Sequence, residues 1–473
     1  MLVNRKDFNC RTGSILALVL LFLAAGVHAV TLDGISIQGA SGVTTSEQEA
    51  PSVRAAESLF RSSVPQNDHL WTFDQITHRV LLEHPAILAK RSAAEAARAD
   101  VDAAKWERFP TPAITADKSL DERFVTPARN IDPSKNTDKT FILQQPLWSG
   151  GRITYSISAA KFRYGESQES IHEVEENILL AIANAFVEAS RWQAHKAVRA
   201  ESLQQHQHLY EMIKRRVQAE ASPQVDLDLA QGRLYQSESD LSYAEQMMQS
   251  ALLQLSQLAG SPVGAVAALE GALFSQLESQ EKSVSGAQAQ SPVLARLAHA
   301  KDAAEADVNI KKSAYWPQLA LRYEKQTGPF TYNLDRLMLT ANMQIGAGLS
   351  IMPGVEAARA RAEAAALERE SATRDLAQQV SVDWSNYVAA RARVVQASKA
   401  SLISDIVFES YTRQYTAGRK SWLDVMNSVR EASQSKDMII DVYAQMIGSG
   451  LRLLVLTGRL HPAALEEPLR YTQ

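Results

Sequence analysis

The side chains best suited to chemistry in this sequence are its histidines and carboxylates, and their spacing forms no catalytic or metal-binding set. His206 and His208 point in different directions on a helix, so they would not jointly hold a metal ion. His172-Glu173 lacks the spacing of a metal-binding helix motif, and no nucleotide-binding P-loop is present. We therefore expect histidines that lie solvated on helix faces, no metal, no cofactor and no enzymatic activity.

A second group of polar residues lies around Asp226 and in the segment from Tyr415 to Val425. Ser421-Trp422-Leu423-Asp424 has the S-x-x-D pattern of a helix start, where an acid interacts favourably with the helix dipole. This favours a helix-start role for Asp424. If three copies assemble around one axis, their Asp424 carboxylates would lie close together, and salt, a cation or pairing with Lys420 or Arg419 of a neighbouring copy would ease the repulsion. This role is compatible with the helix start.

Long helices must position these residues. One stripe steps by three or four residues, as a single helix face does: Ile171, Val174, Ile178, Ile182, Ala185, Ala189 and Trp192. It belongs to a helix predicted from Gly151 to about Ala219, on the order of 100 Å long. Ser222-Pro223 predicts a cap and a first-turn proline for the next helix.

The sequence also has an internal repeat, because its two halves resemble each other. His84-Pro85 is repeated as Ser291-Pro292, and Phe109-Pro110 as Trp316-Pro317, at one common spacing. Asp226 matches Asp424 at a slightly shorter spacing. Each half is therefore expected to be one structural unit, and the difference in length to fall in a loop.

Each half contains a candidate strand pair. Apolar residues alternate with small or polar ones from Leu337 to Ser350, and Leu319, Leu321 and Tyr323 alternate with polar neighbours. Such alternation fits a membrane strand or a half-buried hairpin of a soluble domain. Four strands cannot close a barrel, so membrane strands would require several protomers to share one.

Composition and the N-terminal segment limit the expected partners and the expected location of the protein. The chain has 473 residues, 45% of them hydrophobic, and a formal net charge of −4, which gives no indication of nucleic-acid binding. Residues 1–29 have the pattern of a cleaved secretory signal peptide; an uncleaved anchor is the alternative. Cys10, the single cysteine, precedes its apolar segment.

The repeat, the strand pairs and two local signatures resemble the TolC-like outer membrane efflux protein family over nearly everything from Thr72 to Gly458. One signature is Gln145-Pro146-Leu147-Trp148-Ser149-Gly150-Gly151-Arg152, similar to the family's turn from strand into long helix. The other is Tyr415 to Val425, similar to the family's second periplasmic helix-tip turn. The resemblance implies a homotrimer, mainly α-helical with membrane β-strands. Its α-barrel would continue into a shared twelve-stranded β-barrel in the outer membrane, four strands from each protomer.

The resemblance also implies roles for individual residues. Charged and aromatic groups that narrow the periplasmic entrance in the family correspond by position to Tyr415, Lys420 and Asp424, with Asn427 where a second acid is usual. The first tip offers Asp226, and Glu220 stands where glycine is usual. Phe109, Trp148 and Trp316 are expected as interfacial aromatics beside the junction prolines Pro110 and Pro317.

The expected organisation assigns every part of the chain to a signal peptide, a repeat unit or a connecting segment. It comprises a signal peptide (1–29), a flexible polar leader (30–70), a first repeat (71–260, hairpin about 110–148), a linker (261–290), a second repeat (291–458, hairpin about 317–351) and a tail (459–473).

The expected function is that of an exit duct. It would receive substrate from an inner-membrane ABC or proton-driven pump and a periplasmic adaptor, and would pass it through the outer membrane. By family analogy, many multidrug ducts carry a lipid-anchoring cysteine near their mature start. The predicted mature start of this chain lacks such a cysteine and has an extended polar leader, and both features favour type I protein secretion. Multidrug or small-molecule efflux is the alternative, followed by a periplasmic coiled-coil adaptor or scaffold.

Overall fold

The computed structural model describes residues 49–64, 70–118, 137–269, 277, 279–327, 334–343 and 350–460, all within the compact unit Glu47–Gln473. The predicted signal peptide and most of the predicted leader and tail lie outside these residues. So do the connections within both predicted hairpins, and Ile345, Ala347 and Leu349 of the predicted alternation.

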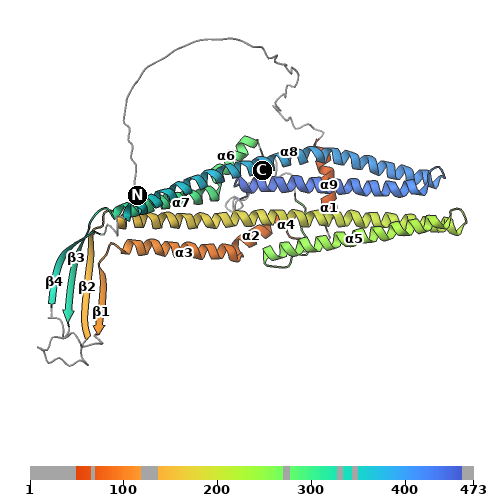
Figure 1. The fold of residues 1–473 in the computed structure, drawn as a ribbon. Coiled ribbons are helices and arrows are strands. Elements are labelled where there is room, and N and C mark those ends of the chain that lie inside the picture. Colours follow the sequence, from red (N-terminus) through yellow and green to blue (C-terminus); the bar gives the residue numbers. More distant parts are fainter. Residues whose placement is uncertain are drawn as a thin grey trace, which may run out of the picture. The chain divides into compact units, whose positions relative to one another are not determined.

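Two long helical hairpins dominate this unit (Figure 1). α4 (Arg152–Gln218) turns back into α5 (Gln224–Ala259), and α8 (Ile351–Thr416) turns back into α9 (Trp422–Leu456). α4 also packs along α9, which joins the two hairpins. The predicted stripe of α4 is confirmed, because Ile178, Ile182, Ala185 and Ala189 are buried.

Shorter helices precede each long one, and they break at equivalent positions. They are α2 (Phe73–Glu83), α3 (Pro85–Trp106), α6 (Gln280–Gln290) and α7 (Pro292–Ser313). His84 accepts a hydrogen bond from Ala86 N at the start of α3, and Ser291 accepts one from Leu294 N at the start of α7. A capping side chain followed by proline therefore starts a new helix at each of these two positions.

Four strands form one antiparallel sheet in the order β1-β2-β3-β4. They are β1 (Thr111–Lys118), β2 (Thr137–Trp148), β3 (Gln318–Thr327) and β4 (Leu334–Asn342). The strands of the two halves meet where β2 pairs with β3, with a register shift between Pro146 and Trp148. Figure 1 shows the sheet beside the ends of α3, α4 and α7, remote from the turns between the long helices.

The central core of the unit gathers residues from both hairpins. Phe186 and Ile182 of α4 and Tyr443 and Leu451 of α9 are fully buried there. Among the described helices, α9 is the one whose length and apolar composition would suffice to cross a membrane, but 83% of its apolar window is buried. It is therefore the core helix of the bundle.

Helices lie in the predicted leader and in the predicted linker. The end of the predicted leader forms α1 (Glu49–Ser62), where Ala56 and Phe60 enter the central core and the Phe60 ring lies 4.9 Å from that of Tyr443. The predicted linker (261–290) contains α6 and a parallel bridge between Trp71 and Val266. The expectation of a flexible leader was wrong for α1, because the contacts that bury Ala56 and Phe60 come from distant parts of the chain.

Candidate functional site

The turn between α8 and α9 presents the predicted entrance residues. Gly418 adopts a left-handed conformation (φ +71°), and Arg419 N donates to Gln414 O at 2.9 Å, which closes the C-terminus of α8. Ser421 then caps α9 through a 3.2 Å bond from Leu423 N. The turn therefore places Asp424 in the first turn of α9, as the sequence predicts.

Asp424 and Lys420 lie close to each other within one chain. The distance from Lys420 Nζ to Asp424 Oδ2 is 3.6 Å, and the ammonium also lies 4.3 Å from the ring centroid of Tyr411. Both side chains are half-buried, so the pair is partly screened by solvent. Asn427 follows one helical turn later and is also half-buried.

Tyr415 is a core residue of the tips. It is 4% exposed and packs with Leu209 and Ile213 of α4 and Trp422 of α9. The guanidinium of Arg216, at the end of α4, lies 4.9 Å from its ring centroid. Tyr415 therefore connects the two helical tips, which the sequence did not indicate.

The turn between α4 and α5, called the first tip, has the same backbone geometry as the turn between α8 and α9, the second tip. Glu220 adopts φ +56°, the left-handed conformation that Gly418 takes in the second tip. The sequence predicts Pro223 in the first turn of the helix. In the structure α5 begins one residue after Pro223, which is therefore the N-cap residue and makes no side-chain cap hydrogen bond. Asp226 lies in the first turn of α5, at the position equivalent to Asp424 in α9.

Exposed aromatic side chains gather where helices meet strands. Phe109, Trp148 and Trp316 are all exposed, and the rings of Trp148 and Trp316 lie 6.1 Å apart. Trp106 is also exposed, with its ring 4.9 Å from that of Phe109, and the sequence analysis did not single it out. Its helical spacing from Phe109 would have been the available signal.

The junction itself is tightly packed. Gly150 has φ +61°, and a side chain there would lie 2.8 Å from both Ser313 O and Trp316 Cβ. Arg152 Nη1, at the start of α4, donates to Glu107 Oε2 at 2.9 Å. Glycine and this ion pair therefore hold the strand-to-helix turn against the ends of α3 and α7.

The sheet has one apolar and one polar face. Leu321 of β3 lies opposite Leu339 of β4, and Tyr323 opposite Leu337, so the two predicted alternations share a face. Ile114 and Phe141 lie opposite each other on the same face. Leu337 is 67% and Ile114 77% exposed, which leaves a large apolar surface uncovered in the protomer.

The sequence matches one protein family in two segments. The description "Outer membrane efflux protein" covers residues 76–261 and again residues 284–459. The chain belongs to the outer membrane efflux protein family. Both helical hairpins, both strand pairs and both tips fall within the two matched segments. No curated protein sequence matches this chain significantly.

Solved channels share the fold of this chain at low sequence identity. The outer membrane protein VceC from Vibrio cholerae is 16% identical, with a TM-score of 0.70 over 82% of this chain and 96% of that one. The CmeC outer membrane channel from Campylobacter jejuni is 12% identical, with a TM-score of 0.71 over 82% and 85%. The open state of the MtrE outer membrane channel from Neisseria gonorrhoeae is 15% identical, with a TM-score of 0.67 over 82% and 88%.

Within the described residues, His195 and His206 are buried, which corrects the expectation of solvated histidines. His195 of α4 contacts Asp437 and Asp441 of α9 through its two ring nitrogens. His206 lies 2.8 Å, Nδ1 to O, from Ser202 one turn earlier. Among the described residues, no group of His, Cys, Asp and Glu is arranged to hold a metal ion.

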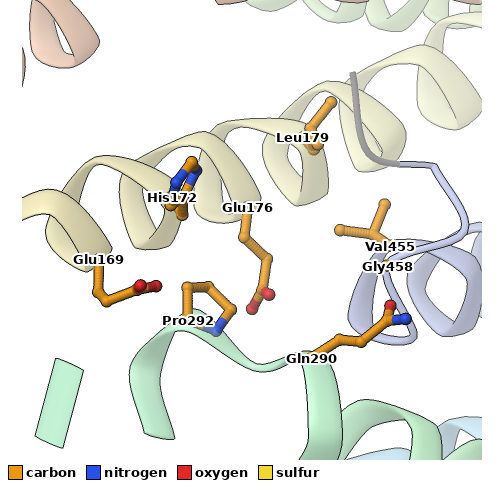
Figure 2. A pocket seen from close by; sticks show the side chains of 8 residues that line it. All are labelled: Glu169, His172, Glu176, Leu179, Gln290, Pro292, Val455 and Gly458. Atoms are coloured by element: carbon orange, nitrogen blue, oxygen red, sulfur yellow. The ribbon is translucent and has the colours of Figure 1, made fainter. Parts of the chain in front are cut away.

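A cavity of about 210 Å³ lies where α4 faces the α6–α7 junction and the end of α9 (Figure 2). Glu169, His172 and Glu176 of α4 line it, together with Gln290, Pro292 and Val455. Burial, and then the charge of Glu173, raises the pKa of the Glu176 carboxyl to about 7. Glu176 is therefore partly protonated near neutral pH.

Proposed function

We propose that this protein is the outer membrane exit duct of a tripartite export system and acts as a homotrimer. The observation that carries the proposal is the sheet, whose edge strands β1 and β4 each pair on one side within the described residues. An unpaired strand edge cannot lie in lipid, because its backbone groups have no water to bind. Two further copies would pair these edges and close a twelve-stranded barrel.

The helices would then form the periplasmic part of the duct. Each predicted repeat unit (71–260 and 291–458) would supply two strands and one long helical hairpin, so that the β-barrel continues into an α-helical tunnel. The aromatic side chains exposed at the junction would lie at the periplasmic interface of the outer membrane, because aromatic side chains concentrate at membrane interfaces. They are Phe109, Trp148 and Trp316. The predicted signal peptide would direct export and be cleaved.

The tips would form the periplasmic entrance. Asp424, Lys420 and Asn427 at the second tip and Asp226 at the first would lie near the trimer axis, and Tyr415 would hold the tips together. The proposed partners are a periplasmic adaptor and an inner-membrane ABC or proton-driven pump, which would supply the energy. Pairing of Lys420 in one copy with Asp424 in the next would help to keep the entrance closed until an adaptor docks.

The proposed cargo is a secreted polypeptide. It rests on the analogy given above, in which many multidrug ducts carry a lipid-anchoring cysteine and the single cysteine here is Cys10. Deleting the gene should remove one large extracellular or surface protein and leave drug tolerance unchanged. Broad sensitisation to drugs and detergents with secretion intact would instead assign small-molecule efflux.

Cell fractionation tests the duct itself. The protein should remain with the outer membrane after a high-salt wash, because its exposed apolar sheet face would contact lipid. Release by salt would support a periplasmic scaffold and contradict the duct.

A further inference from the structure

The polar face of the sheet carries a compact cluster of charges. Glu324 of β3 is 3% exposed, and three donors of the same face surround its carboxylate. Arg336 Nη2 of β4 lies 3.1 Å from Oε1, Arg322 Nη2 lies 3.2 Å from Oε2, and Gln326 Nε2 donates to Oε1 at 2.6 Å. Two guanidinium groups therefore share one carboxylate.

The guanidinium groups keep capacity for another ligand. The side chains of Arg322 and Arg336 are 33% and 44% exposed, although Glu324 beneath them is almost fully buried. Each guanidinium has five N–H donors, and one carboxylate cannot satisfy both groups. A planar guanidinium group can bind a carboxylate or a phosphate through two parallel N–H···O hydrogen bonds.

The cluster lies at mid-depth of the strands. Arg322 follows the junction residue Pro317 by roughly 17 Å of extended chain. The neighbouring positions of the polar face at this level are uncharged, since Arg322 lies opposite Gln144 and Met338, and Glu324 opposite Ile142. The acidic pair of Asp117 and Asp138 lies farther from the helices.

We propose that Arg322 and Arg336 form an oxyanion-binding ring inside the barrel, which makes the duct selective for anions at this level. The inference rests on the proposed function, because the apolar face can meet lipid only if the polar face points inward. Three protomers would then bring six guanidinium groups and three carboxylates to one level of the lumen. Anionic solutes and carboxylate-rich segments of a cargo would bind there, and cations would be repelled.

Single-channel recording with citrate as the probe tests the ring. The purified full-length protein is inserted into a planar lipid bilayer at low salt, and citrate is added to each side in turn. Citrate should block the current when it is added on the side of the bilayer that faces the strands, remote from the helical tips. In a salt gradient, the current should reverse at a potential that indicates a preference for anions. The triple substitution Arg322→Gln, Glu324→Gln and Arg336→Gln should raise the half-blocking concentration at least about tenfold, as loss of charge-assisted hydrogen bonds predicts.

Two further variants make the result specific. Glu324→Gln alone leaves both guanidinium groups without their carboxylate, so it should strengthen the block. The matched control is Lys325→Gln with Asp335→Asn, a pair 3.8 Å apart on the opposite face of the same strands, which should leave the block unchanged.

The outcomes separate the two proposals. Channels that form in the triple variant with an unchanged citrate block overturn the ring and leave the duct intact. A citrate block that Lys420→Gln at the tips abolishes and the triple variant does not also overturns the ring. If wild type and Asp424→Ala both insert stably and neither forms conducting channels, the duct and the ring are overturned together.

Discussion

His195 on α4 lies 2.9 Å, Nδ1 to Oδ1, from Asp437 on α9. Its other ring nitrogen lies 3.0 Å from Asp441 Oδ1, so both nitrogens face carboxylates and both must donate. Arg199 and Arg191 of α4 pair with the same two acids at 2.6 and 3.0 Å, and Asp240 of α5 lies 3.9 Å from Arg199. This network, buried at His195 and Asp437, connects the two helical hairpins below their tips.

The His195 network predicts a stability that falls as pH rises. Burial alone would lower the pKa of His195, but its hydrogen bonds to Asp437 and Asp441 outweigh burial and raise it. The folded state therefore binds the proton more tightly than the unfolded chain. The stabilisation is complete below about pH 6.5 and is lost as pH rises through the raised pKa. The Tm of wild type should drop between pH 6 and 8.5 more than that of His195→Gln.

His206→Gln is the matched control for this prediction. Burial lowers the pKa of His206, which lies on the same helix, so its contribution is present above about pH 6.5 and is lost on acidification. Substitution there should therefore change the pH dependence in the opposite sense. Equal differences in Tm between wild type and His195→Gln at both pH values would contradict the network.

Glu176→Gln should stabilise the protein at alkaline pH. The pKa of Glu176 is raised from 4.5 to about 7, so the folded state binds this proton more tightly and stability falls as pH rises between these values. Above pH 8 the carboxylate costs up to about 3 kcal/mol per protomer, which glutamine would remove. The Tm should rise at pH 8.5 and change little at pH 4.

Glu169→Gln serves as the control for this second prediction. It removes a carboxylate from the same cavity, on the same face of α4 (Figure 2). Its Tm should follow that of wild type at both pH values. A gain at pH 8.5 equal to that of Glu176→Gln would show that the total charge of the helix, and not burial of Glu176, sets the effect.

The features that local sequence determines could be predicted. The spacing of Ile178, Ile182 and Ala185 gave the buried face of α4, because helix periodicity requires no knowledge of partners. The alternation of Leu319 and Leu321 with polar residues likewise indicated that these two side chains lie on one face of their strand. Asp424 was placed in a first helical turn by the residues immediately before it.

The features that depend on distant segments could not be predicted. His195 and Asp437 are separated by 242 residues, and neither has a local pattern that indicates the other. Phe60 of α1 reaches its partner Tyr443 across most of the chain. Burial of Tyr415 likewise requires Leu209 and Ile213 of the other hairpin. Periodicity shows which face of a helix is buried, and it does not show what covers that face.

Asp424→Ala should change conduction with little effect on stability. The pair with Lys420 is half-exposed at 3.6 Å, so its loss should cost less than about 1 kcal/mol. In a trimer the substitution would remove three carboxylates near one axis, so block by a multivalent cation added at the periplasmic side should weaken. The control is Glu409→Gln, whose pair with Arg413 at 3.5 Å lies exposed on α8. Unchanged conductance and cation block in Asp424→Ala would leave that residue a helix-start acid alone.

Substituting the residue with a left-handed conformation should change the free energy of unfolding in opposite directions at the two tips. Glu220 has φ +56° and Gly418 φ +71°, and a non-glycine residue in this conformation costs roughly 1 kcal/mol or more. Glu220→Gly should therefore raise the free energy of unfolding by about 1 kcal/mol, less the extra entropy of glycine in the unfolded chain. Gly418→Ala should lower it by a similar amount, because no atom lies within 4 Å to add a clash. Equilibrium denaturation of the two variants beside wild type measures both shifts, and a loss of stability in Glu220→Gly would show that its side chain stabilises the tip.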